Sequence, residues 1–348
     1  MKEWVHFACT SEDINNNSYA LMLKEGKGIL TKYIEESLNK LEKFGKKYKD
    51  LPMMSRTHGQ PASPTTVGKE FINFAYRIRR EYQKLNRHEV EGKMNGASGN
   101  YNAHHFVFDN IDWIEESSRF VDRYLKIKPL LYSTQINNYS YISELLHILI
   151  RIASIVIDID RDVWGYISFE YFKQKMKKNE VGSSTMPHKV NPIDFENSEG
   201  NMGLAISQME HLSTKLLNSR FQRDLTDSTV LRNLGTIFSH VLLGLKKLNK
   251  GLNKIEVNEN KLEEDLKKNI ELLAEPVQSV MRVYKEKNPY EKLKELTRGR
   301  KITQEDINEF VDTLNKVPDF IKAKMKKLTP EKYTGLASKL VDKYFEER

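Results

Sequence analysis

The chain has 348 residues, and its 56 basic and 48 acidic side chains give a formal charge of +8. Its apolar content is too high for a disordered chain, its length favours about two domains, and its single cysteine excludes an internal disulfide and a cysteine-only metal site. The positive charge favours anionic partners, namely nucleic acid, an acidic membrane surface or small phosphates and carboxylates, without choosing among them.

The N-terminal segment and the apolar stretches give no sign of export or of a membrane span. The first residues contain no apolar run of the length found in secretory signals. The most apolar stretch, at 147–159, is interrupted by Arg151 and Asp158 and is too short to cross a bilayer. We therefore expect a soluble, cytoplasmic protein with no membrane partner.

Apolar residues recur at spacings of three and four in five segments, which is the pattern of long helices packed side by side. In chain order these segments lie at 30–44, 67–85, 142–163, 202–216 and 231–252. Ser63 followed by Pro64 is a favourable start for the second of these helices. The 142–163 segment is apolar on more than one face, so we expect it in the middle of a bundle or an oligomer.

Beyond residue 251 the helical segments become shorter, more charged and interrupted by prolines. The segment at 94–102 contains an Asn-Gly pair and a second glycine, which predicts a loop or a small hairpin. We therefore predict an all-α fold, with a long-helix bundle domain at 1–252 and a smaller helical domain at 253–348.

Three polar segments, at 8–18, 55–64 and 181–201, interrupt the helical pattern. In the third, Gly182, two serines, Lys189 and Asn191 precede the predicted start of a helix at 193. Backbone N–H groups, hydroxyls, a cation and a helix N-terminus together make an anion-binding environment. The alternative is a Ser/Gly-rich linker between two helices.

The other two polar segments each allow two interpretations. His58 lies in a loop before a long helix and is a candidate general acid or base, although a lone loop histidine is more often a surface residue. Thr10 or Ser11, followed by Glu12 and Asp13, has the pattern of a helix N-cap with first-turn acids, or else binds a ligand. No histidine pair or acidic loop has metal-ligand spacing, so we expect no metal and no cofactor.

The three segments together resemble a known family. The string GSSTMPHKVNP at 182–192 matches the signature loop of the fumarase/aspartase superfamily without departure. The flanking strings are similar to the adenylosuccinate lyases of the bacterial type: TSEDINN, SRTHGQPA, GNYNAH, STQI, QRDLTDSTVLRN, AEPVQSVMR and PYEKLKELTRG. The resemblance runs over essentially the whole chain.

This resemblance implies a carbon–nitrogen lyase of purine biosynthesis. It implies an anti β-elimination that splits adenylosuccinate into AMP and fumarate, and the succinyl-aminoimidazole-carboxamide ribotide in the same way. It assigns Ser183 as the catalytic base and His58 as the acid, with Glu196 bracing the loop and His58. The matched substrate-binding residues are Thr10, Ser11, Thr57, Gln135, Ser184, Lys189, Asn191, Arg223, Ser228 and Arg232.

The resemblance also implies a homotetramer whose active sites are shared between subunits and whose core contains twenty long helices. Family members begin with a further domain of about a hundred residues before the point where this chain starts. That domain supplies phosphate contacts and another histidine, so we expect the chain as given to assemble through its long helices but to have little lyase activity.

The sequence leaves three other functions open. The chain could be another lyase of the superfamily, such as argininosuccinate lyase or fumarase, although these lack the RDLTDS string. It could be a structural tetramer without activity. Nucleic-acid binding is the third, but the basic residues are spread through the helices and are not clustered with aromatic side chains, so we expect no nucleic-acid partner.

Overall fold

The computed structural model describes residues 2–175, 190–297 and 302–348. Its contacts divide the chain into two compact units. The first, which we call the bundle unit, contains Met1–Asn39, Arg77–Trp164 and Val181–Lys254. The second, the hairpin unit, contains Lys40–Tyr76, Gly165–Glu180 and Ile255–Arg348. The elements are almost all helices, which confirms the predicted all-α class.

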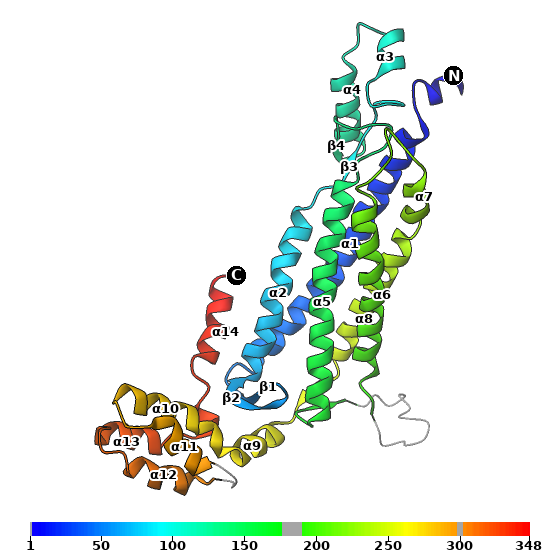
Figure 1. Ribbon diagram of the computed structural model, residues 1–348. Coiled ribbons are helices and arrows are strands. Elements are labelled where there is room, and N and C mark those ends of the chain that lie inside the picture. Colours follow the sequence, from blue (N-terminus) through cyan, green and yellow to red (C-terminus); the bar gives the residue numbers. More distant parts are fainter. Residues whose placement is uncertain (1, 176–189, 298–301) are drawn as a thin grey trace. The chain divides into compact units, whose positions relative to one another are not determined.

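The five longest elements are helices (Figure 1): α1 (Ser11–Lys47), α2 (Val67–Arg87), α5 (Ser140–Ser168), α6 (Ile193–Lys215) and α8 (Leu234–Leu252). In the bundle unit, α6 and α8 pack closely because glycines on α8 face large side chains of α6. A Cβ atom on Gly244 would lie 2.7 Å from Met202, and one on Gly251 would lie 2.7 Å from Phe195.

The predicted apolar seams form the interior of the single chain. In the 142–163 seam every member is at most 1% exposed, and the 231–252 seam is also buried apart from Phe238, which is half-buried. A polar strip of α5, including Glu144, His147 and Arg151, remains exposed. The seams thus bury their apolar surface within one chain. Association between chains would therefore use surfaces other than these seams, through which the sequence predicted assembly.

Short elements cover one end of the bundle unit. They are η1 (Lys2–His6), β3 (Glu91–Gly92), α3 (Asn102–Val107), α4 (Trp113–Arg119), the π-helical turn η2 (Phe120–Tyr124), β4 (Lys128–Pro129) and α7 (Thr226–Leu231), with β3 and β4 paired in parallel. The 94–102 segment is mostly a loop that runs into α3, and Gly99 has a φ of +82°. A Cβ atom there would lie 2.3 Å from the Ser133 carbonyl oxygen, so this close approach requires glycine.

The hairpin unit contains two antiparallel pairs of strands that the sequence did not reveal. One joins β1 (Pro52–Thr57) to β2 (Gln60–Thr66), and the other joins β5 (Phe172–Gln174) to β6 (Ile255–Val257). The predicted helix start at Ser63 and Pro64 is wrong, because both residues lie in β2. The Thr66 hydroxyl instead accepts a hydrogen bond from the Lys69 N–H at 3.2 Å and caps the first turn of α2.

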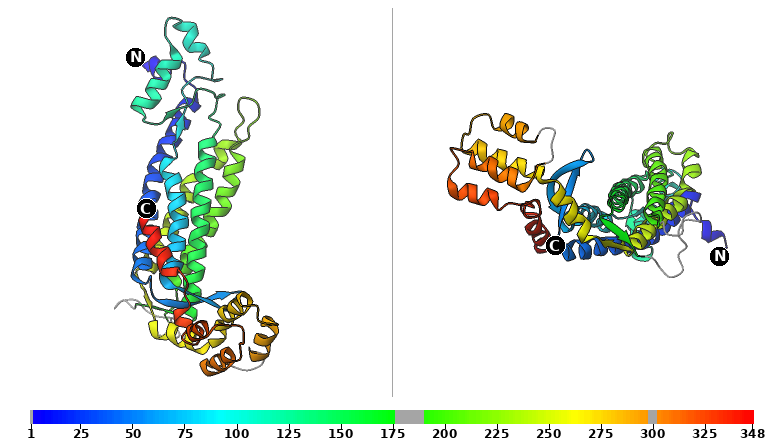
Figure 2. Two further views of the ribbon diagram at one scale, coloured as in Figure 1. Left: turned by 90° about the vertical axis from the view of Figure 1, so that its left-hand side faces the viewer. Right: turned by 90° about the horizontal axis from the view of Figure 1, so that it is seen from below.

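The C-terminal part of the hairpin unit is a series of short helices, most of which lie together in Figure 2. They are α9 (Glu259–Lys268), η3 (Ile270–Leu273), α10 (Ala274–Val283), α11 (Pro289–Thr297), α12 (Gln304–Asp312), α13 (Asp319–Lys326), η4 (Pro330–Lys332) and α14 (Ala337–Glu346). An apolar core of their own, including Met281, Ile307 and Val311, holds α10 to α13 together. A domain boundary at 252/253 stays a prediction.

Among the helices in the described part of the chain, none combines the length and the apolar character needed to cross a bilayer.

Candidate active site

The N-terminus of α1 carries two acidic side chains that are buried rather than solvated. Glu12 and Asp13 are 4% and 2% exposed, although the sequence presents them as ordinary first-turn acids. The Asp13 carboxylate accepts the Thr10 N–H at 2.8 Å and forms an ion pair with the fully buried Lys93 at 3.0 Å. Lys93 also donates to the Gln135 carbonyl at 2.7 Å, so one buried cation fixes both the start of α1 and the Gln135 loop.

Burial lowers the pKa of the Lys93 ammonium, and the neighbouring Asp13 carboxylate opposes that shift. A buried ion pair of this kind holds its surroundings in one arrangement only if its hydrogen bonds are complete. Here the Lys93 ammonium also donates to the Gly96 carbonyl at 3.1 Å, and Asp13 also accepts the Asn95 N–H at 3.1 Å. This pair therefore forms a rigid base beneath Thr10 and Ser11.

Arg223 joins three segments that are distant in the sequence. Its guanidinium donates to the Ser11 hydroxyl at 3.3 Å and to the Gln135 side-chain oxygen at 3.1 Å, and it forms an ion pair with Glu12 at 3.1 Å. Its side chain is only 17% exposed. The structure thus brings together Ser11, Gln135 and Arg223, three residues that the resemblance had matched to the substrate.

A buried tyrosine extends this network to α7. The Tyr139 hydroxyl lies 3.3 Å from a Glu12 oxygen and 3.1 Å from an Asp227 oxygen, and the other Asp227 oxygen accepts the Ser228 N–H at 2.7 Å. Burial raises the pKa of the Tyr139 phenol, and both carboxylates raise it further, so the phenol stays protonated. Because a phenol has one proton, it donates to only one of the two carboxylates at a time.

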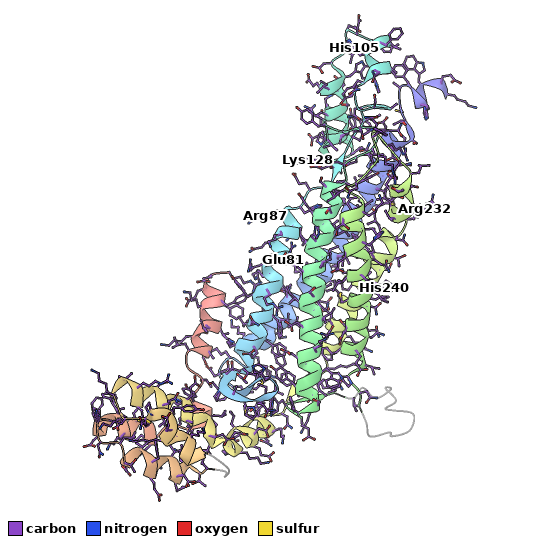
Figure 3. All side chains as sticks on the ribbon, viewed as in Figure 1. Glu81, Arg87, His105, Lys128, Arg232 and His240 are labelled. Carbon is purple, nitrogen blue, oxygen red and sulfur yellow. The ribbon has the colours of Figure 1, made fainter. Side chains whose placement is uncertain are left out.

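A cavity of about 470 Å³ opens beside Arg223 and is lined by Gln135, Arg223 and their neighbours at 221–225. Ser228 is partly buried on α7, whereas Arg232, labelled in Figure 3, is exposed at the C-terminal end of that helix. A guanidinium held in place beside a cavity of this size is suited to an anionic group of a small molecule.

Thr57 and His58 lie in the hairpin unit, at the turn between β1 and β2. Thr57 pairs with Gln60, so His58 and Gly59 are the two residues of the turn. Both have positive φ, 55° and 75°, which is the geometry of a type I′ turn. The His58 side chain is exposed at the tip of the hairpin. The predicted loop histidine is thus presented by a defined hairpin turn.

The remaining predicted residues lie within the signature string at 182–192 or, for Glu196, shortly after it. Ser183, Ser184 and Lys189 lie outside the described residues. Asn191 is half-buried just before α6, and Glu196 is exposed on the first turn of α6, where it accepts the Trp164 indole N–H at 3.1 Å.

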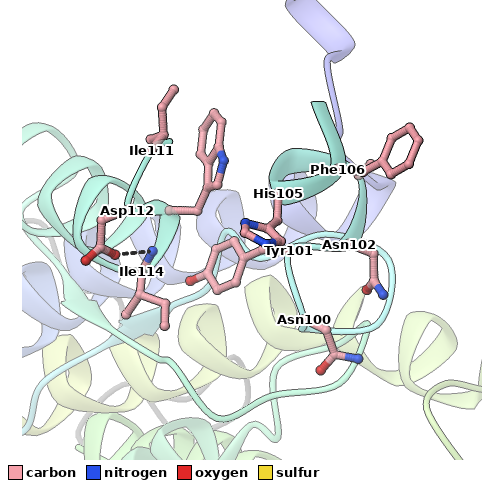
Figure 4. A pocket seen from close by; sticks show the side chains of 10 residues that line it. Asn100, Tyr101, Asn102, His105, Phe106, Ile111, Asp112 and Ile114 are labelled. Carbon is pink, nitrogen blue, oxygen red and sulfur yellow. Dashed lines mark hydrogen bonds between the residues drawn. The ribbon is translucent and has the colours of Figure 1, made fainter. Parts of the chain in front are cut away.

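A second cavity, of about 830 Å³, lies between α3 and α4 (Figure 4). It is lined mainly by aromatic, aliphatic and amide side chains, and Asp112 caps α4 by accepting the Ile114 N–H at 3.1 Å. Its lining includes none of the predicted site residues that the structure describes. The cavity beside Arg223 is smaller, but it is lined by two predicted site residues, Gln135 and Arg223, and is therefore the better candidate for the active site.

Sequence reasoning missed the residues that hold the site together, namely Glu12, Asp13, Lys93, Tyr139 and Asp227. Two signals for them were present. The acidic pair directly follows Thr10 and Ser11, and Asp227 lies inside the quoted QRDLTDSTVLRN string. Lys93 and Tyr139 gave no local signal, because their functions depend on partners from other segments.

Comparison with known proteins identifies relatives over nearly the whole chain. The family model described as "Lyase" matches residues 1–206, and the one described as "Adenylosuccinate lyase C-terminal" matches residues 219–334. The adenylosuccinate lyase of Haemophilus influenzae is 51% identical over 344 residues, which cover 99% of this chain and 75% of that protein. The adenylosuccinate lyase of Escherichia coli strain K12 is 51% identical over 343 residues, covering 98% and 75%.

Solved structures support the fold. The fumarate lyase from a Mesorhizobium species has a TM-score of 0.80 at 16% identity and covers 99% of this chain and 78% of its own. The 3-carboxy-cis,cis-muconate lactonizing enzyme from Pseudomonas putida has a TM-score of 0.78 at 17% identity, covering 98% and 76%. From its sequence identity over nearly its whole length and from this fold, the chain belongs to the adenylosuccinate lyase family of the fumarase/aspartase superfamily.

Proposed function

We propose that the chain contributes to an adenylosuccinate lyase that releases fumarate from adenylosuccinate, leaving AMP, and that treats the succinyl-aminoimidazole-carboxamide ribotide in the same way. The observation that carries the proposal is the Arg223 guanidinium, held by Ser11, Gln135 and Glu12 beside a cavity of about 470 Å³. Because the chain belongs to the adenylosuccinate lyase family, we assign this arrangement to bind the phosphate and ribose end of a purine nucleotide. The proposal includes a cytoplasmic location.

The reaction needs a base, an acid and fixed positive partners. The base removes a proton from the carbon next to a succinyl carboxylate, the carbon–nitrogen bond breaks, and the acid returns a proton to the departing nitrogen. We assign Ser183 as the base and His58 as the acid. Charge spreads into the carboxylate during the reaction, so Lys189 and Asn191 are assigned to bind and stabilise it.

The remaining predicted residues orient the substrate. Thr10, Thr57 and Ser184 contribute hydroxyls, and Ser228 and Arg232 extend the phosphate and ribose contacts. Glu196 is assigned to brace the signature loop and His58. The homotetramer with shared sites belongs to this proposal, because a base, an acid and a phosphate site from distant segments can meet between subunits.

A substrate panel tests the proposal. Adenylosuccinate, the succinyl ribotide, argininosuccinate and malate are each supplied to the intact enzyme, and fumarate is measured by its absorbance. We expect fumarate from the two purine-related substrates only. Turnover of argininosuccinate or malate instead would assign the chain to another lyase of the superfamily, and no fumarate from any substrate would favour a structural tetramer.

A further inference from the structure

The turn that carries His58 has an unfavourable backbone conformation for a residue with a side chain. His58 has a φ of 55°. The left-handed region is unfavourable for a residue with a Cβ atom, and such residues persist when their surroundings hold them. An exposed two-residue turn makes few contacts of its own, so the support has to come from the strands and from what packs against them.

Arg56, on β1 two residues before His58, supplies that support. Its guanidinium donates to the Gly59 carbonyl at 3.3 Å, which links the last part of β1 to the second residue of the turn. Its other terminal nitrogen donates to the Tyr171 hydroxyl at 3.1 Å and to the Asp265 carboxylate at 3.4 Å. These partners belong to the same unit and lie outside the hairpin, Tyr171 just before β5 and Asp265 on α9.

The anchoring group is itself well fixed. Tyr171 is fully buried, and its hydroxyl donates to Asp265 at 2.9 Å. The Arg56 guanidinium carbon lies 4.2 Å from the centre of the Phe169 ring, which adds a cation–π contact. The Arg56 side chain is 19% exposed. The planar guanidinium therefore reaches the turn, a buried phenol and a carboxylate at once, which a lysine cannot do.

We propose that Arg56 is a positioning residue for His58: it clamps the turn so that the imidazole is presented in one orientation for proton transfer. This inference rests on the proposed function of His58 as the acid. Misplacing a catalytic group by about 1 Å can cost about a hundredfold in rate. A loosened turn should therefore lower kcat while leaving the phosphate and carboxylate contacts, and thus KM, nearly unchanged.

The test is a double-mutant cycle in the intact enzyme, with Arg56→Lys, His58→Gln and the double variant. We expect Arg56→Lys to lower kcat by about ten- to a hundredfold and to change KM by less than about threefold. In the His58→Gln background the same change should alter kcat by less than about twofold, because the group being positioned is gone. Asp342→Asn, which breaks an exposed ion pair with Lys49 in the same unit, is the control and should change neither constant.

Each outcome decides something different. Equal effects of Arg56→Lys with and without His58 would show a purely structural residue and overturn the inference alone. A raised KM at unchanged kcat would also overturn it. If His58→Gln keeps the parent kcat and pH profile, both the inference and the assignment of His58 as the acid fail. If Arg56→Lys does not fold, Tyr171→Phe, which removes one anchor, should give the same pattern with a smaller loss of kcat.

Discussion

Buried polar side chains hold the residues of the candidate site in place. Glu12, Asp13 and Asp227 are each at most 5% exposed, and each makes contacts that fix a residue matched to the substrate. A buried carboxylate is costly unless it is paired or hydrogen-bonded, so these positions can hold their neighbours only in the arrangement observed. Removing one partner of such a pair leaves the other charge uncompensated.

Ser183→Ala should abolish most turnover while substrate affinity changes little. Proton abstraction occurs only on the way to the transition state, so kcat should fall by about three to four orders of magnitude. Single-turnover fumarate release and substrate binding are measured separately. Ser184→Ala is the matched control and should lose less kcat. If Ser183→Ala keeps more than a tenth of the parent activity, the assignment of the base is wrong and Ser184 becomes the candidate.

Asp160, on α5, should make the folded state less stable as the pH rises. Burial raises the pKa of this carboxyl to about 8, the Glu199 carboxylate adds to the shift, and the Ser198 hydroxyl opposes it. The folded chain then keeps a proton that the unfolded chain loses near pH 4. The free energy of unfolding should therefore fall by up to about 1.4 kcal/mol per pH unit between about pH 4 and pH 8.

Asp160→Asn removes this titration while keeping the size of the side chain. The variant should match the parent in denaturation midpoint near pH 4 and be more stable than the parent at pH 8. Urea denaturation at both pH values measures the difference. Equal pH dependence in parent and variant would show that Asp160 is charged in the folded chain.

At the scale of elements, close contacts between helices depend on a few small residues. Gly45 on α1 and Gly68 on α2 face each other in the hairpin unit, and a Cβ atom on Gly68 would lie 2.4 Å from the Gly45 carbonyl oxygen. Backbone atoms cannot move away as a flexible side chain can, so the two helices approach this closely only with glycine at that position.

Gly68→Ala should destabilise the chain by about 1–3 kcal/mol, because the added methyl group forces the helices apart. Gly28→Ala is the matched control, since it lies on an exposed part of α1 where an added methyl group would have no atom within 4 Å. It should stabilise the chain by about 0.5–1 kcal/mol through helix propensity. Urea denaturation of both variants tests the pair, and effects of equal sign would contradict the close-contact explanation.

At the scale of the whole molecule, the surfaces left for association are not the predicted seams. Those seams are buried within one chain, whereas Met22 and Ile29 on α1 and Leu243 on α8 are 56%, 52% and 47% exposed. Met22 and Ile29 are seven residues apart and lie on one face of α1. Scattered exposed apolar residues are common, but a line along a long helix is a suitable surface for packing against another helix.

The proposed homotetramer should give a light-scattering mass of four times the 40.7 kDa of the chain. Ile29→Asp should shift the mass toward smaller species, because a charge at a packed interface is costly. Ile29→Leu keeps the position apolar and should leave the mass unchanged. A parent mass of one chain would contradict the homotetramer, and an unchanged mass for Ile29→Asp would place the interface elsewhere.

The sequence by itself determined the long helices, the all-α class and the family, because helical periodicity and unbroken motifs such as GSSTMPHKVNP are local signals. It also pointed to Ser11, Gln135 and Arg223 separately. It did not reveal the β1–β2 hairpin, since Ser63 and Pro64 carry a stronger signal for a helix start than for a strand, and pairing with β1 decided the outcome.

Only the tertiary structure decided how the site is held. The Lys93–Asp13 pair, the contacts of Tyr139 with Glu12 and Asp227, and the contacts of Arg56 with Tyr171 and Asp265 all join residues that are far apart in the chain. Their strength depends on burial and on distances of about 3 Å, which no local pattern encodes. Local periodicity therefore specified the helices, and the three-dimensional packing specified which polar side chains meet.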